Sequence, residues 1–117
     1  MQEKVTFLDL KTDINKQEGL ELITLRVRTI LTLKKILGKG EVELSVPEGT
    51  TLEELLMTMV KRWGDELASH LFEPKSTSVL PYIRLMVNGR DIAFLNRMET
   101  VLENGDEVLI LPPISGG

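Results

Sequence analysis

The chain of 117 residues has no cysteine, a single histidine, and few aromatic residues: one tryptophan, one tyrosine and three phenylalanines. Without cysteine, a disulfide framework, a cysteine-ligated iron–sulfur cluster and a thiol nucleophile are excluded. The lone His70 likewise excludes a histidine-rich metal site, so we expect no metal. No apolar run approaches the length that spans a membrane, and the first residues lack the apolar core of a signal peptide. We therefore expect a cytoplasmic protein without a membrane partner.

An excess of positive charge is also missing. The formal net charge is −4, and lysines and arginines are not interleaved with aromatic residues, so nucleic acid is not an expected partner. Hydrophobic residues make up 42% and charged residues 27% of the chain, which are ordinary values for one globular domain.

Two alternating segments predict a pair of strands. Between Ile23 and Leu31 one face holds only small or apolar side chains, namely Leu25, Val27, Thr29 and Leu31. Residues 41–46 alternate in the same way, and residues 32–37 between them predict a turn or a short helical piece. The Gly38-Lys39-Gly40 sequence matches neither glycine-rich phosphate-loop pattern. We interpret it as the turn of a hairpin rather than as a nucleotide site.

The strongest periodic pattern predicts a helix from about Thr51 to Gly64. Thr50 with Glu53, or Thr51 with Glu54, has the spacing of a capping box. Six apolar residues form one continuous stripe at helical spacing: Leu52, Leu55, Leu56, Met59, Val60 and Trp63. A second, shorter helix is predicted over residues 65–72.

The remaining segments predict two more strands, over residues 82–87 and 107–111, and a short strand or extended piece over residues 92–95. Asn88-Gly89 and Asn104-Gly105-Asp106 supply turns between them. A right-handed crossover through the helix would make the first and last strands parallel. The predicted fold class is α+β, a β-grasp in which a mixed sheet curls over one main helix.

The final six residues, 112–117, predict a tail that projects from the last strand. Pro112 and Pro113 stiffen its start. Six extended residues reach about 20 Å. Gly116 and Gly117 lack a Cβ and could pass through a narrow tunnel, although a frayed terminus would have the same composition. The predicted organisation is an N-terminal arm or extra strand over 1–22, a β-grasp domain over 23–111, and the tail.

The alternation in the last strand predicts which face meets a partner. We assign Val108 and Ile110 to the core, so that Leu109 and Leu111 face outward. Unless the N-terminal arm covers them, exposed apolar side chains mark an interaction site. The predicted partner-binding residues are Leu109, Leu111, Pro112, Pro113, Ile114 and Ser115.

Three stretches resemble the MoaD/ThiS family of ubiquitin-like sulfur carriers, most closely its MoaD branch. They are residues 46–56 at the helix start, Val87-Asn88-Gly89, and residues 102–117, which hold the last turn and the Pro-Pro-x-x-Gly-Gly tail. The resemblance implies that an activating (adenylating) enzyme uses ATP to form an acyl-adenylate at the Gly117 carboxylate. A sulfur donor then converts it to a thiocarboxylate, while Gly116 lets the tail thread. This chain itself would bind no cofactor.

In the MoaD branch the tail enters the large subunit of molybdopterin synthase, which transfers the sulfur to a pterin precursor. The resemblance therefore implies a role in molybdenum or tungsten cofactor biosynthesis. Three alternatives stay open at this point: a ThiS-type sulfur donor for the thiamine thiazole, a modifier that joins Gly117 to lysines of target proteins, and a non-covalent β-grasp interaction module.

Overall fold

The computed structural model describes residues 21–113. The expected N-terminal arm, apart from its last two residues, and the tail residues Ile114 to Gly117 lie outside the described residues. The predictions that fall on those segments remain predictions.

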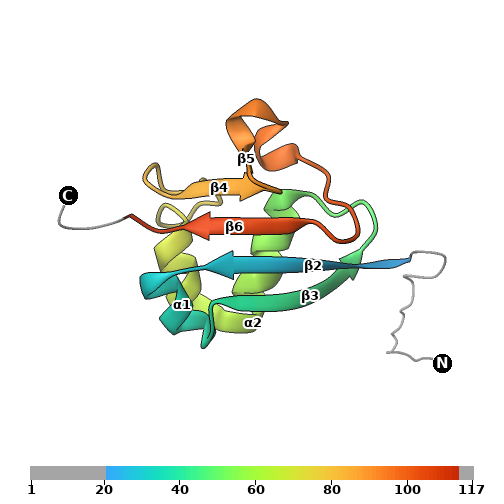
Figure 1. Cartoon of the computed structure of the whole chain (residues 1–117). Coiled ribbons are helices and arrows are strands. Elements are labelled where there is room, and N and C mark those ends of the chain that lie inside the picture. Colours follow the sequence, from blue (N-terminus) through green and yellow to red (C-terminus); the bar gives the residue numbers. More distant parts are fainter. Residues whose placement is uncertain (1–20, 114–117) are drawn as a thin grey trace, which may run out of the picture.

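One mixed sheet of five strands organises the described part of the chain, in the order β3-β2-β6-β4-β5 (Figure 1). Its strands are β2 Leu22–Thr29, β3 Glu41–Pro47, β4 Arg84–Val87, β5 Arg90–Asp91 and β6 Glu107–Leu111. Strand β2 pairs antiparallel with β3 and parallel with β6, while β4 pairs antiparallel with both β5 and β6. The predicted parallel pairing of the first and last strands of the domain is confirmed.

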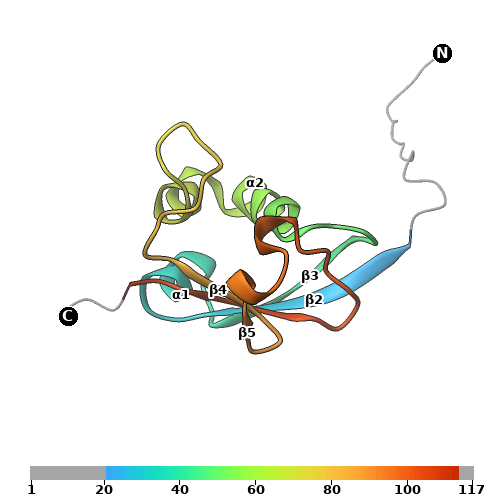
Figure 2. The same cartoon turned by 90° about the horizontal axis from the view of Figure 1, so that it is seen from above.

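The helices are α1 Leu31–Leu37 and α2 Leu52–Leu71, with two 3-10 turns, η2 Ile92–Phe94 and η3 Arg97–Glu99. Helix α2 lies over one face of the sheet (Figure 2). The side chain of Thr51 accepts a hydrogen bond from the Glu54 amide, and Glu54 bonds back to the Thr51 amide, so the predicted capping box is present at the second of its two expected positions. Gly64, where the helix was predicted to end, has the non-helical angles φ 82° and ψ −164°. Helix α2 is therefore kinked at this residue before it continues to Leu71.

The sequence prediction is wrong at Leu31. We expected this residue to continue the inner face of the first strand, but β2 ends at Thr29 and Leu31 begins α1 with 52% of its surface exposed. The amide of Thr29 donates to the carbonyl of Gly40, which closes the β2–β3 pair at that point. The chain then turns away from the sheet, with Leu31 in the left-handed region at φ 58°.

The segment after Asn88-Gly89 also differs from its prediction. Residues 92–95 were expected to form a short strand or an extended piece, yet β5 is only Arg90–Asp91 and Ile92–Phe94 forms the 3-10 turn η2. The Asp91 carboxylate accepts from the Ala93 amide, a local bond that favours a turn over a ladder. Phe94 consequently points into solvent with 78% exposure. The third predicted strand is shorter than expected too, since β4 begins at Arg84.

The core lies between the inner face of the sheet and α2. Strands β2 and β3 alternate strictly between exposed and buried residues over most of their length, and α2 contributes a row of buried leucines and Met59. Val60 and Trp63, predicted in the same stripe, pack at its margin and are only partly buried. Within residues 21–113 no helix is both long enough and apolar enough to cross a membrane.

Candidate functional site

Strand β6 connects the fold to the predicted tail. It lies between β2 and β4 in the sheet and runs parallel to β2, from Arg26 opposite Glu107 to Thr29 opposite Ile110. Strand β2 leads into α1. Because β6 runs parallel to β2, the end of β6 and the start of α1 lie at the same end of the sheet, as both views show (Figures 1 and 2). The predicted tail therefore begins beside α1.

The exit of β6 is fixed by one buried side-chain hydrogen bond. The Thr29 hydroxyl, on a residue that is 3% exposed, donates to the carbonyl oxygen of Ile110 at 2.6 Å. Two residues later Pro112 is buried, whereas Pro113 is exposed. Pro112 thus departs from its expected place on a partner-facing surface and belongs to the anchor of the strand. The described chain leaves the domain surface at Pro113.

The start of β6 is fixed by two side-chain amides and one carboxylate. Asn88 accepts from the amide of Glu107 at 2.9 Å and donates to the Asp106 carboxylate at 2.8 Å. The same carboxylate accepts from the amide of Glu103 at 2.8 Å, and Asn104 accepts from the amide of Thr24 at 2.8 Å. These bonds tie the two predicted turns to each other and to β2. They set the register of β6, and with it the position of the exit.

The outward side of the sheet carries a short apolar strip, which consists of Met86, Leu109 and Leu111. As predicted, Val108 and Ile110 face the core at 0% and 1% exposure, and Leu109 and Leu111 alternate with them. Met86 is directly opposite Leu109 in the β4–β6 pair. All three side chains are half-buried rather than fully exposed. The strip is thus a shallow apolar surface on the strand that leads to the tail.

Arginines flank this apolar strip on both sides. Arg28 is opposite Leu109 on β2, and Arg84 is opposite Leu111 on β4. Arg28 contacts the Glu107 carboxylate at 3.2 Å, and Arg84 contacts the Asp91 carboxylate at 3.1 Å. These exposed pairs contribute little to stability. They hold the two guanidinium groups beside the apolar strip, where they are available to a partner.

The only titration shift resolved among the described residues lies at this face. The pKa of Asp91 falls below its ordinary value of 3.8, because the Ala93 amide and then the Arg84 guanidinium stabilise its charged form. Asp91 therefore stays ionised through the neutral range, and Arg84 keeps its partner.

Sequence reasoning found Leu109 and Leu111 but missed their neighbours. Met86, Arg28 and Arg84 come from two other strands, and their place beside β6 depends on the strand order. The available signal was the alternation in residues 84–87, which puts Arg84 and Met86 on one face. The structure brings these five residues together. It does not describe Ile114, Ser115, Gly116 or Gly117, whose predicted roles are untested.

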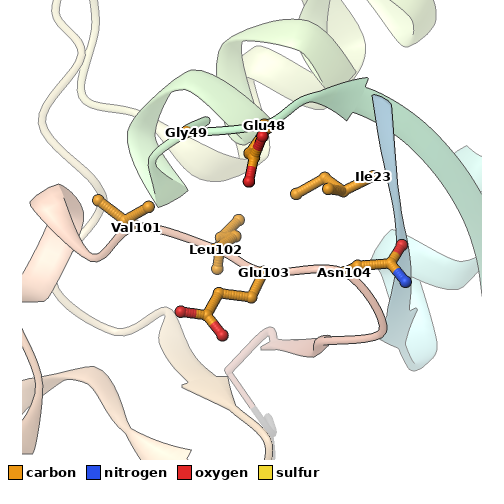
Figure 3. A pocket seen from close by; sticks show the side chains of 7 residues that line it. All are labelled: Ile23, Glu48, Gly49, Val101, Leu102, Glu103 and Asn104. Atoms are coloured by element: carbon orange, nitrogen blue, oxygen red, sulfur yellow. The ribbon is translucent and has the colours of Figure 1, made fainter. Parts of the chain in front are cut away.

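A hollow of about 630 Å³ lies at the opposite end of the sheet, where β6 begins (Figure 3). Buried Leu102 lies between the side chains of Glu48 and Glu103, and buried Ile23 lies to one side of them. A whole strand separates this hollow from the exit of β6, so it is not part of the tail site. Over the described residues, no group of three or more His, Cys, Asp and Glu is placed to hold a metal ion. His70 is exposed, and its Nδ1 lies 2.9 Å from the carbonyl oxygen of Glu66.

A family model described as the ThiS family matches residues 30–117, which include the β6 exit and the Gly-Gly end. The chain belongs to the ThiS family. Its members are ubiquitin-like sulfur carriers, and the resemblance inferred from the sequence is confirmed. The sheet order and the covering helix are those of the β-grasp fold, as predicted.

Relatives of this chain include proteins named as modifiers. Small archaeal modifier protein 3 of Haloferax volcanii is 30% identical over 93 residues, which cover 80% of this chain and 98% of the relative. The solution structure of the Haloferax volcanii HVO 2177 protein is 29% identical with a TM-score of 0.69, over 82% of this chain and 88% of that one. The solution structure of small archaeal modifier protein 1 from Methanosarcina acetivorans is 26% identical with a TM-score of 0.67, over 83% and 99% of the two chains.

Proposed function

We propose that this ThiS-family chain is a sulfur carrier that reacts through the carboxylate of Gly117. In the first step a carboxylate oxygen attacks the α-phosphorus of ATP, which forms an acyl-adenylate and releases pyrophosphate. In the second step sulfide supplied by the sulfur donor attacks the acyl carbon and displaces AMP, which leaves a thiocarboxylate and releases a proton. Both steps take place in partner enzymes, the activating enzyme and the sulfur donor. This chain supplies the reacting atom and the surface that positions it.

The observation that carries the proposal is the match to the family model through residue 117, on a strand built to deliver that end. Strand β6 is bonded on both sides, its exit is anchored at Thr29 and Pro112, and the exposed chain begins at Pro113. The chain has no cysteine and matches neither glycine-rich phosphate-loop pattern. That composition agrees with a division of labour in which partners hold ATP and perform the chemistry.

We propose molybdopterin biosynthesis as the destination of the sulfur, since the Pro-Pro-x-x-Gly-Gly ending resembles the MoaD branch. In that role the tail enters the large subunit of molybdopterin synthase. Pro113, Ile114 and Ser115 would line the entrance, Gly116 would pass the narrowest part, and Leu109 and Leu111 would dock against the outside. The apolar strip between two arginines supports a partner of mixed apolar and acidic character.

A second candidate is protein modification, in which the activated Gly117 is joined to a lysine amine of a target protein. Two relatives favour it by name, small archaeal modifier protein 3 of Haloferax volcanii and small archaeal modifier protein 1 of Methanosarcina acetivorans. The two candidates share the adenylate and differ in the nucleophile that displaces AMP. A sulfur nucleophile gives the carrier, and an amine gives the modifier.

Reconstitution with the activating enzyme of the same cell tests the proposal. The wild-type chain should support ATP–pyrophosphate exchange, and added sulfur donor should yield a thiocarboxylate. Deleting Gly117 shortens the reach by about 3.3 Å and should abolish exchange at any enzyme concentration, since a misplacement of 1 Å can cost about a hundredfold in rate. As a folding control, the deletion should change the free energy of unfolding by less than about 0.5 kcal/mol.

The outcomes separate the candidates. A thiocarboxylate without lysine adducts supports the carrier, and lysine-linked adducts support the modifier. Full exchange activity in the Gly117 deletion would refute both, because the reacting carboxylate would then lie elsewhere.

A further inference from the structure

The end of the sheet at which β6 exits is basic, although the protein as a whole is acidic. Four cations and no carboxylate occur between residues 28 and 40, although the net charge of the chain is −4. The cations are Arg28, Lys34, Lys35 and Lys39. Arg28 pairs with Glu41 at 3.7 Å and with Glu107 at 3.2 Å on the sheet. Among the described residues the three lysines, on or next to α1, make no ion pair with a carboxylate.

Two apolar side chains are exposed beside these lysines. Ile30 is 39% exposed and Leu31 is 52% exposed, and they join β2 to α1. Leu31 also has a left-handed backbone, with φ 58°, which costs a side chain of this kind about 1–2 kcal/mol. A large apolar residue that is both strained and exposed gains little from folding at this position. We define Ile30, Leu31, Lys34 and Lys35 as the α1 ledge.

Lys34 connects the α1 ledge to the outward face of the sheet. It lines a hollow of about 500 Å³ with Leu31, Lys35 and Gly38. It also lines a second hollow, of about 360 Å³, with Leu109, Arg28 and the Glu41 carboxylate that pairs with Arg28. Its aliphatic stem lies close to Gly40, where an added Cβ would be 3.6 Å from its Cδ. The ledge is therefore continuous with Leu109 and its apolar strip, and it lies next to the exit of β6.

We propose that the α1 ledge is a docking surface for an acidic segment of the activating enzyme, next to the channel that receives the tail. This inference rests on the proposed function, and it assigns to the ledge the chemistry of the contact. Carboxylates of the enzyme would meet Lys34 and Lys35, and an apolar side chain would cover Leu31. An acidic partner is the complement of this charge pattern, and an apolar contact explains why Leu31 is left exposed.

The lysines have a second role that any test must separate from docking. They lie in the last turn of α1, where positive charge also stabilises the free carbonyl groups of the helix end. Replacing them will affect folding as well as binding. The design therefore combines a charge reversal, a matched reversal elsewhere, and a substitution that should not weaken the fold.

The charge reversal is Lys34→Glu with Lys35→Glu. ATP–pyrophosphate exchange is measured against the concentration of this chain at several salt concentrations. We expect KM to rise about tenfold at low salt, as for two charged contacts at the rim of an interface, with kcat unchanged. The wild-type KM should rise with salt and that of the variant should not. The matched control is Lys61→Glu with Arg62→Glu, which reverses two exposed cations on α2, changes the net charge by the same amount and should keep the wild-type KM.

The second variant is Leu31→Asn. Asparagine adopts the left-handed conformation more readily than leucine, so the melting temperature should stay the same or rise. Docking should nevertheless weaken, with KM raised about threefold to tenfold, because an exposed apolar contact is lost. If Leu31 had only a structural role, the two results would be reversed: the melting temperature would fall and KM would stay unchanged.

Each result has one meaning. A raised KM, lost salt dependence and an intact fold support the ledge as the docking surface. Wild-type KM and salt dependence in both variants would overturn this inference while leaving the proposed function in place. If the wild-type chain itself supports no exchange, the proposed function fails, and the ledge assignment fails with it.

Discussion

The two ends of β6 are held in place by different chemistry. At the start of the strand, Asn88, Asn104 and Asp106 make directional side-chain hydrogen bonds that fix the turns to each other and to β2. At the exit, one buried hydroxyl and one buried proline hold the strand, next to the apolar strip and to Arg28 and Arg84 with their carboxylate partners. The start sets the register, and the exit leaves apolar and cationic side chains for partners. The start of β6 therefore positions the strand, and its exit presents the side chains that a partner would recognise.

The largest expected effect of breaking this arrangement is at Asn88. Asn88→Ala removes two hydrogen bonds and places alanine at φ 52°, so the free energy of unfolding should fall by about 2–3 kcal/mol in a urea titration. Asn88→Gly keeps the backbone conformation and should lose only about 1–2 kcal/mol. Two variants that each remain within about 0.5 kcal/mol of wild type would mean that the start of β6 is not its anchor.

The next largest effect is expected at the exit, at Thr29. Thr29→Val keeps the side-chain volume but removes the donor to the Ile110 carbonyl, so stability should fall by about 1–2 kcal/mol. Thr24→Val is the matched control on the same strand, at an exposed residue, and should change stability by less than about 0.5 kcal/mol. Equal effects of the two substitutions would show that the buried hydroxyl does not hold the exit.

A substitution at Leu111 tests the role of the exit in partner binding separately from its role in folding. Leu111→Asp should cost at most about 1 kcal/mol of stability, since the side chain is only half-buried on the outward face. It should weaken binding to the activating enzyme or the large subunit, because a charge would then enter an apolar contact without a partner. Leu111→Met, which conserves volume and polarity, should bind normally. Unfolding of Leu111→Asp would contradict the outward assignment.

The smallest expected effect is the pH dependence of the pair of Arg84 and Asp91. The folded-state pKa of Asp91 is lowered, so its contribution is fully present above the ordinary value of 3.8 and is lost as pH falls through the folded value. Asp91→Asn should therefore differ from wild type in thermal stability at neutral pH and converge with it under more acidic conditions. A difference that grows on acidification would have the wrong sign.

Sequence reasoning worked where periodicity and local chemistry agree. The stripe from Leu52 to Met59, the Thr51 capping box and the alternation of Val108 to Leu111 each follow from spacing within one element. They fixed the main helix, the core face and the outward face without knowledge of the fold.

The predictions fail where a local hydrogen bond or a neighbouring strand determines the conformation or the surroundings of a residue. Leu31 fits the strand alternation, but the last bond between β2 and β3 is from Thr29 to Gly40, and the chain turns into α1 at Leu31. Phe94 fits a strand composition, but the Asp91 side chain bends the chain into a turn. Met86 and Arg84 join the site only through the order of strands, which comes from long-range pairing. The burial of Pro112 likewise follows from tertiary packing and has no sequence signal.

The most direct test of the central claim is the intact mass of the chain purified from its own cell during active cofactor synthesis. The account predicts a fraction of molecules in which one oxygen is replaced by sulfur, with the exchange located at Gly117 by fragmentation and absent from a strain that lacks the activating enzyme. An unmodified mass in cells that are making the cofactor, with the activating enzyme present, would contradict the claim that this chain carries sulfur.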